Sequence, residues 1–123
     1  MRLFIISNRL PLKAQRVGKE FRFSRSEGGL ATGLDSLEMS VEKYWIGWPG
    51  LYTENEGEKE NIRLYLEKFH FFPVFLSSRQ IHDYYEGYSN STVWPLCHYF
   101  FSYVQYDRSF WQAYREVNQL FCE

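Results

Sequence analysis

Residues 84–99 combine the side chains that a sugar-phosphate pocket needs. Aromatic faces can stack on a pyranose ring, and the phenol and indole groups at their rims can donate hydrogen bonds. A Ser/Asn-rich stretch before Pro95 predicts a turn, at residues 87–90, that separates two helices. An aromatic-rich helix–turn–helix that serves packing alone is the alternative. The aromatic residues concerned are Tyr84, Tyr85, Tyr88, Trp94 and Tyr99.

A second candidate lies near the amino terminus. The short apolar run of residues 3–6 predicts an inner strand of a parallel sheet, covered on both faces. Arg9 follows this strand, and ligands of open α/β sheets bind just outside the carboxyl ends of the strands. The fork of donors on an arginine suits a phosphate. A surface arginine in a loop explains the position of Arg9 equally well.

Trp48 is expected at the same edge of the sheet as Arg9. Residues 43–48 precede Pro49 and Gly50, and this order predicts a second strand that ends in a turn. A tryptophan at the end of that strand offers a flat apolar face for a sugar ring.

Gly28 and Gly29 begin a predicted helix, whose apolar spacing continues through Leu30, Leu34 and Leu37. Two glycines at a helix start let a ligand approach free backbone N–H groups, where the helix dipole favours negative charge. A plain glycine-rich turn is the alternative.

The remaining elements must position these residues. A third strand at residues 71–76 completes an order of strands and helices that is typical of a doubly wound, mainly parallel α/β layer. Residues 13–27 are expected to form a long mobile loop, in which residues 21–23 could make a small hairpin strand. Residues 61–69 predict a helix, whereas the acidic residues 53–60 before it are expected to be exposed.

Three helices are expected after the third strand. Ser77 and Gln80 form a capping-box pattern, which begins the helix that carries the tyrosine pair. Residues 94–104 predict the next helix, and Asp107 is expected to cap the last one. The apolar face of this last helix consists of Phe110, Tyr114, Val117 and Phe121.

Composition limits the classes of function. The chain has 123 residues, enough for one small domain, and its net charge of −1 provides no global field for nucleic acid or anionic lipid. The apolar run after Met1 is too short for a signal peptide or a membrane span. Cys97 and Cys122 lack metal-ligand spacing, so we expect free thiols in a cytoplasmic protein. We expect no metal or cofactor.

We also expect the chain to be a fragment. The last helical pattern continues to Glu123 without a glycine, proline or polar tail, and three strands are too few to cover the predicted helices. Uncovered apolar faces favour self-association. We expect it to involve Phe110, Tyr114 and Phe121.

Five motifs of the chain occur in one known family in the same order. Together they extend over nearly the whole chain, and the last motif is long and specific. The chain resembles the amino-terminal part of trehalose-6-phosphate synthases. The motifs are Ser7-Asn8-Arg9-Leu10-Pro11, Gly28-Gly29-Leu30, Trp45-Ile46-Gly47-Trp48-Pro49-Gly50, Pro73-Val74-Phe75-Leu76-Ser77 and the segment from Tyr84 to Tyr99.

The resemblance implies a partial Rossmann-like domain of a two-domain GT-B glycosyltransferase, of which residues 1–123 are the amino-terminal part of the acceptor-binding domain. It also implies roles for four residues in binding glucose 6-phosphate. Arg9 and Tyr85 match ligands of the acceptor phosphate, and Trp48 and Trp94 match tryptophans that wall its glucose ring. We expect these four side chains to converge on one hollow beside the glycine-opened helix.

Gly28 and Gly29 match the backbone that closes on the diphosphate or glucose of the donor, UDP-glucose. The family's further acceptor aspartate, active-site histidine and Arg/Lys pair are expected beyond residue 123, so no catalytic residue is expected in this chain. His82 is expected to be solvated, and His98 to make a structural hydrogen bond.

The resemblance therefore predicts the amino-terminal portion of a retaining glucosyltransferase that makes trehalose 6-phosphate, with the fragment alone inactive. A non-catalytic sugar-phosphate-binding module or regulatory paralogue is the alternative, and a structural fragment with an unformed pocket is another.

Overall fold

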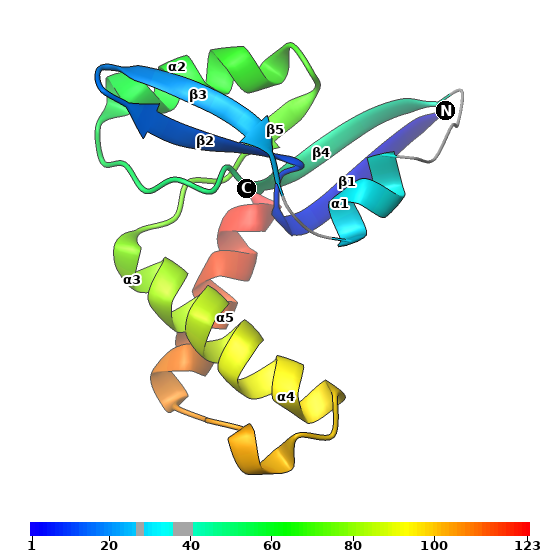
Figure 1. Cartoon of the computed structure of the whole chain (residues 1–123), viewed down its shortest axis with the longest axis vertical. Coiled ribbons are helices and arrows are strands. Elements are labelled where there is room, and N and C mark those ends of the chain that lie inside the picture. Colours follow the sequence, from blue (N-terminus) through cyan, green and yellow to red (C-terminus); the bar gives the residue numbers. More distant parts are fainter. Residues whose placement is uncertain (27–28, 36–40) are drawn as a thin grey trace. The chain divides into compact units, whose positions relative to one another are not determined.

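The computed structural model of the chain describes residues 1–26, 29–35 and 41–123. They fold into two compact units, Met1–Phe75 and Leu76–Glu123 (Figure 1). Within the described part of the chain, no helix has both the length and the apolar character needed to cross a membrane.

A three-stranded parallel sheet is the frame of the first unit, with the strand order β1-β4-β5. Helix α2 lies between β4 and β5 in the chain, so this is a strand–helix–strand unit of the α/β class, as predicted. The third strand is shorter than expected and ends at Pro73, which cannot donate to a strand ladder. The bounds are β1 (Arg2–Arg9), β4 (Glu42–Trp48), α2 (Glu56–Glu67) and β5 (Phe71–Pro73).

Strand β1 lies at the edge of this sheet, and the prediction that both of its faces are covered was wrong. Ile5 is buried, but Phe4 and Ile6 are 60% and 63% exposed. Successive side chains of a strand point to opposite faces, so the core of the unit covers the Ile5 face alone. On the other face Phe4 stacks on Tyr44, with ring centroids 5.2 Å apart.

The prediction of a long loop over residues 13–27 was also wrong. The chain forms an antiparallel hairpin of β2 (Leu12–Val17) and β3 (Glu20–Arg25), and Gly18 adopts a φ of 63° in the turn between them. The alternation around residues 21–23 was the correct signal. Phe23 stacks on Tyr65 of α2 with ring centroids 3.8 Å apart, so this hairpin is packed.

The core of the first unit lies between β1, β4, the hairpin and α2. Helix α1 (Gly29–Asp35), which begins where a glycine-opened helix was predicted, contributes Leu34 to its margin. The predicted position of Leu37 lies outside the described residues. The buried members of the core are Ile5, Leu10, Ala14, Trp45, Ile62 and Leu66.

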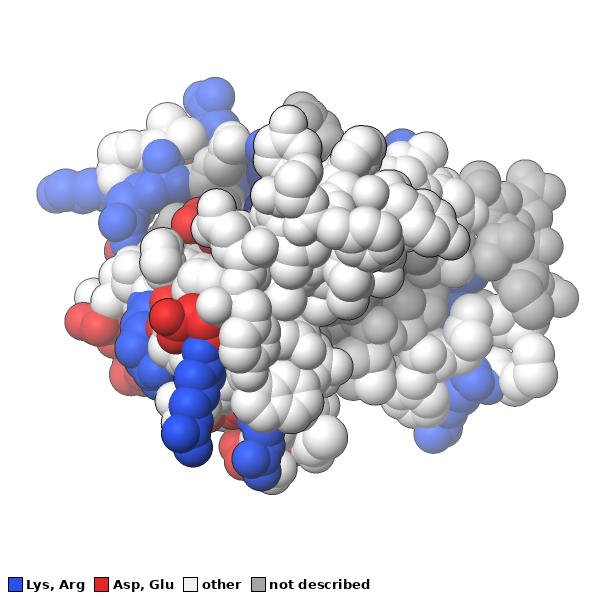
Figure 2. Space-filling view, turned by 90° about the horizontal axis from the view of Figure 1, so that it is seen from below, with Lys and Arg blue, Asp and Glu red and all other residues white. Residues whose placement is uncertain are grey.

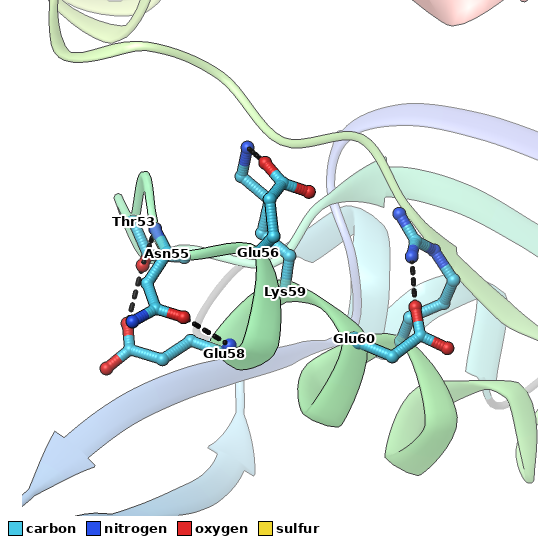
Figure 3. A network of polar contacts seen from close by, with 7 residues as sticks. Thr53, Asn55, Glu56, Glu58, Lys59 and Glu60 are labelled. Atoms are coloured by element: carbon cyan, nitrogen blue, oxygen red, sulfur yellow. Dashed lines mark hydrogen bonds and ion pairs between the residues drawn. The ribbon is translucent and has the colours of Figure 1, made fainter.

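Helix α2 begins five residues before the predicted start, because its acidic segment provides the cap (Figure 3). The side chain of Asn55 accepts a hydrogen bond from the backbone N–H of Glu58 at 3.1 Å. The carboxylate of Glu58 in turn accepts from the hydroxyl of Thr53 at 2.5 Å. Acidic residues in the first turn are favoured by the helix dipole, so the exposed acidic stretch is part of the helix.

The second unit contains one long helix in three parts, and the turn predicted at residues 87–90 is absent from it. The capping box of Ser77 and Gln80 begins this helix as predicted. Gly87 lies in its interior, where it allows close packing instead of a turn. The expected helix over residues 94–104 ends early, at Cys97, and a short 3-10 turn follows. The three parts are α3 (Ser78–Gln80), the π-helix η1 (Ile81–Val93) and α4 (Trp94–Cys97), and the 3-10 turn after them is η2 (Phe101–Tyr103).

Helix α5 (Arg108–Cys122) runs alongside η1 within the second unit (Figure 1). Asp107 caps it as predicted, since its carboxylate accepts from the N–H of Ser109 at 2.7 Å. A Cβ placed on Gly87 would meet the ring of Phe110 at 2.6 Å, so the expectation that Phe110 is uncovered was wrong. Tyr114 is also covered, by the two tyrosines of η1 with which it makes ring contacts.

Candidate functional site: a sheet edge and a helix face

Arg9 and Trp48 meet at the carboxyl edge of the parallel sheet, as predicted. Each is the last residue of its strand, and the two are register partners of β1 and β4. The guanidinium carbon of Arg9 lies 5.4 Å from the centroid of the Trp48 ring, a cation–π distance. Arg9 is exposed, whereas Trp48 is buried. The first unit therefore presents an accessible cation that is held against an aromatic ring.

A close approach of two backbones positions Arg9. The pairing of β1 with β4 changes register between Ile6 and Arg9, and the backbone N–H of Leu10 then donates to the carbonyl of Trp48 at 3.0 Å. A Cβ on Gly47 would lie 2.8–2.9 Å from backbone atoms of Ser7, Arg9 and Leu10. Only glycine fits this position, so Gly47 has a positioning role that the sequence motif alone did not indicate.

Side-chain hydrogen bonds also hold the end of β1 in place. The indole N–H of Trp45 donates to the hydroxyl of Ser7 at 2.7 Å, and this hydroxyl donates to the carbonyl of Arg9 at 2.6 Å. The indole N–H of Trp48 donates to the carbonyl of Leu51 at 3.2 Å. Both tryptophans of the motif are thus oriented by hydrogen bonds, and the end of β1 is tied to β4.

The predicted donor-binding pair is described in part. Gly29 is the first residue of α1 and is exposed; a Cβ built on it meets nothing within 4 Å among the described residues. Gly28 lies outside the described residues. With respect to the described residues the helix start is open at Gly29, and the role of the pair in donor binding stays a prediction.

Tyr85 and Trp94, the other two predicted acceptor ligands, belong to the long helix of the second unit. Tyr85 is half-buried in η1 and Trp94, the first residue of α4, is 51% exposed. The Trp94 ring stacks on His98 at 4.1 Å between ring centroids. It also borders a hollow of about 470 Å³, within the size range of small-molecule sites. The hollow is lined by Asn90, Ser91, Trp94, Pro95, Phe100, Tyr103 and Gln105.

The surface around this hollow is aromatic and uncharged. Residues 94–106 contain no Asp, Glu, Lys or Arg. Figure 2 shows one face of the molecule, on which a broad area has no Lys, Arg, Asp or Glu side chains. A sugar ring, which presents apolar C–H faces, is the kind of ligand that such exposed aromatic rings can stack on.

The histidines of the second unit occupy the positions that the sequence predicted. His82 is exposed and forms a 2.7 Å contact with Asp83, and this hydrogen bond raises the pKa of His82. The Nδ1 atom of His98 lies 2.8 Å from the carbonyl oxygen of Trp94, as expected of a structural hydrogen bond. Burial raises the pKa of the Tyr84 phenol, which packs against Tyr114.

The parallel sheet with its strand-end arginine is typical of an open α/β domain, in which ligands bind at the carboxyl ends of the strands. A family model described as Glycosyltransferase family 20 matches residues 1–123, so the chain belongs to this family.

Two relatives are named as UDP-forming alpha,alpha-trehalose-phosphate synthases. The chain is 43% identical over 99% of its length to an alpha,alpha-trehalose-phosphate synthase [UDP-forming] of Aspergillus niger, and 41% identical over 98% to the 56 kDa subunit of such an enzyme from Kluyveromyces lactis. It covers 26% and 25% of these relatives, so the chain spans about a quarter of their length.

Solved structures give the same fold. The chain is similar to a trehalose-phosphate synthase of Burkholderia xenovorans in complex with glucose-6-phosphate, with a TM-score of 0.65 and 30% identity over 98% of the chain and 24% of that structure. An E. coli protein bound with UDP-2-fluoro glucose matches with a TM-score of 0.64 and 25% identity, over the same shares of both chains. The chain is thus a partial Rossmann-like domain of the GT-B fold.

Proposed function

We propose that the protein to which this chain belongs transfers glucose from UDP-glucose to glucose 6-phosphate and makes trehalose 6-phosphate with retention at the anomeric carbon. Family membership and the names of the relatives support this reaction. In this proposal residues 1–123 are the amino-terminal part of the acceptor-binding domain, and the protein is cytoplasmic. The catalytic groups lie outside this chain, which is inactive alone.

The observation that carries the proposal is the pairing of Arg9 with Trp48 at the sheet edge. A phosphate dianion needs charge-assisted donors, and a guanidinium supplies them in a fixed fork. In our proposal Arg9 and Tyr85 bind the phosphate, whereas Trp48 and Trp94 bound the sugar ring. Binding energy from the remote phosphate then aligns the reacting hydroxyl.

Donor binding and leaving-group stabilisation complete the scheme. In this proposal the open helix start at Gly29, with Gly28 before it, closes on the donor through backbone N–H groups. Transfer needs an acceptor hydroxyl held near the anomeric carbon and a polarised diphosphate, so positioning and electrostatic stabilisation provide most of the rate.

Calorimetric titration of the full-length protein with glucose 6-phosphate tests the role of Arg9. We expect Arg9→Ala to weaken binding by about 1.5–3 kcal/mol, the value of a charge-assisted hydrogen bond. Arg2→Ala is a matched control, because Arg2 is an exposed arginine on the same strand that pairs with Glu42 at 3.7 Å. Equal affinity of Arg9→Ala and the wild-type protein would remove Arg9 from the site.

A regulatory paralogue that binds glucose 6-phosphate without turnover is the second candidate. A coupled assay for UDP release by the full-length protein separates the two, because a sensor binds the acceptor and releases no UDP. UDP release by residues 1–123 alone would contradict our placement of the catalytic groups. Self-association of this chain through its last helix stays a prediction, which sedimentation at high concentration tests.

A further inference from the structure

Helix η1 is a π-helix of thirteen residues, whereas most π-helices are single-turn bulges, which are frequent at functional sites. At its end the backbone N–H of Trp94 donates to the carbonyl of Ser89, five residues earlier. A π-helix has more residues per turn than an α-helix. Over thirteen residues this difference changes which side chains lie on the same face of the helix.

Serine side chains support this winding. The hydroxyl of Ser89 donates to the carbonyl of Tyr84 at 3.0 Å, and that of Ser91 donates to the carbonyl of Glu86 at 2.8 Å. Both acceptors lie five residues earlier, whereas serines in α-helices bond the carbonyl of the previous α-turn. Pro95 has no N–H to donate, and the carbonyl of Ser91 accepts instead from the N–H of Gln105 at 2.7 Å.

The winding places Tyr85 and Trp94 on one face of the helix. A helix with i→i+5 hydrogen bonds has about 4.4 residues per turn, so nine residues complete about two turns. With the α-helical 3.6 residues per turn, the same nine residues make about two and a half turns, which would put the two residues on opposite faces. Nine is the separation of Tyr85 and Trp94 in the sequence.

Ring contacts and close packing identify the face of η1 that packs against α5. Tyr84 and Tyr88 make ring contacts with Tyr114, and Gly87 packs on Phe110. By the same winding of about 82° per residue, Gly87 and Tyr88 lie about 115–165° around the helix from Tyr85 and Trp94, so Tyr85 and Trp94 are on the side away from the Gly87 and Tyr88 contacts.

One more residue belongs to the outer face. Asn90 is exposed, lies between Tyr85 and Trp94 on that face by the same winding, and lines the hollow with Trp94. Its amide offers both donors and an acceptor, which suits the hydroxyl groups of a sugar.

We propose that Asn90 is a further acceptor-binding residue, which hydrogen-bonds a hydroxyl of the hexose between the Tyr85 phenol and the Trp94 indole, and that the π-winding of η1 positions these three side chains together. This inference rests on the proposed function. It adds a polar ligand to a face otherwise described by aromatic rings.

Steady-state kinetics of the full-length protein, with each substrate varied in turn, tests Asn90. We expect Asn90→Ala to raise the KM for glucose 6-phosphate about tenfold, which is the loss of about one hydrogen bond, and to leave the KM for UDP-glucose unchanged. Asn90→Asp keeps the shape and places a carboxylate near a bound phosphate, so it should raise the same KM further, and more strongly at low salt.

Asn118→Ala is the matched control, because Asn118 is an exposed asparagine on α5 that donates to the carbonyl of Tyr114. It should leave both KM values unchanged, and all variants should keep the melting temperature of the wild type. A KM for glucose 6-phosphate within twofold of wild type in both Asn90 variants would overturn the inference. A wild-type protein that neither binds glucose 6-phosphate nor releases UDP would overturn the proposed function instead.

Discussion

The sheet edge of the first unit and the helix face of the second position side chains in different ways. Arg9 and Trp48 come from two strands and meet because parallel strands end at the same edge. Tyr85 and Trp94 come from one helix and share a face because of its winding. A sheet edge thus depends on tertiary pairing, whereas a helix face depends on local backbone hydrogen bonds.

Each region nevertheless contains a glycine at a close approach of two of its elements, Gly47 in the sheet and Gly87 in the helix pair. The atoms that face these two glycines differ. Gly47 faces backbone atoms of the β1 segment, which are fixed by the sheet. Gly87 faces the ring of Phe110, a side chain that can rotate. A larger side chain should therefore destabilise the protein more at Gly47 in the sheet than at Gly87 between the two helices.

The largest effect is expected from Gly47→Ala. Its Cβ would lie under 3.0 Å from three backbone atoms, so the end of β1 must shift. We expect a loss of about 3 kcal/mol in the free energy of unfolding, the upper part of the range for overpacking, as measured by urea denaturation.

Gly33→Ala is the control for this substitution. Gly33 is exposed in α1, and its Cβ would meet nothing within 4 Å among the described residues. Alanine should raise the stability by about 0.5–1 kcal/mol there through helix propensity. Equal effects of the two substitutions would contradict the close approach at Gly47.

A smaller effect is expected from Gly87→Ala, about 1–2 kcal/mol of lost stability, because the Phe110 ring can move aside at a cost in packing. The sharper measurement is a double-mutant cycle with Phe110→Leu, which removes most of the ring. The double variant should lose less stability than the sum of the single variants. Additive losses would contradict the close contact between Gly87 of η1 and Phe110 of α5, because contacting residues are expected to be coupled.

The same contrast explains what could be predicted from the sequence. The strand-end position of Arg9, at the same sheet edge as Trp48, followed from apolar runs and a Pro-Gly turn, because parallel strand ends coincide wherever such strands pair. The winding of η1 could not be predicted. Gly87 and the Ser/Asn stretch are typical of a turn, but the tertiary contact with Phe110 and the side-chain hydrogen bonds of Ser89 and Ser91 support a helix here, and neither can be seen in the sequence.

The smallest effect concerns pH and one carboxylate near the start of a helix in each unit, Glu58 of α2 and the capping residue Asp107 of α5. The hydroxyl of Thr53, and then Arg16, hold the pKa of Glu58 below its ordinary 4.5. The hydroxyl and N–H of Ser109 hold the pKa of Asp107 below its ordinary 3.8. Each carboxylate therefore stabilises the folded chain above its ordinary pKa, and this stabilisation is lost as the pH falls through the lowered value.

Glu58→Gln and Asp107→Asn remove the titration, and the asparagine keeps a capping oxygen. The urea midpoint should fall between pH 6 and pH 3 in the wild type, and by less in either variant. Glu58→Gln should reduce this fall more, because Arg16 reaches Glu58 at 2.6 Å from the hairpin, whereas Asp107 has a local partner two residues away. An unchanged fall in both variants would contradict the prediction, because it would mean that neither the carboxylate of Glu58 nor that of Asp107 contributes to the acid sensitivity of the folded chain.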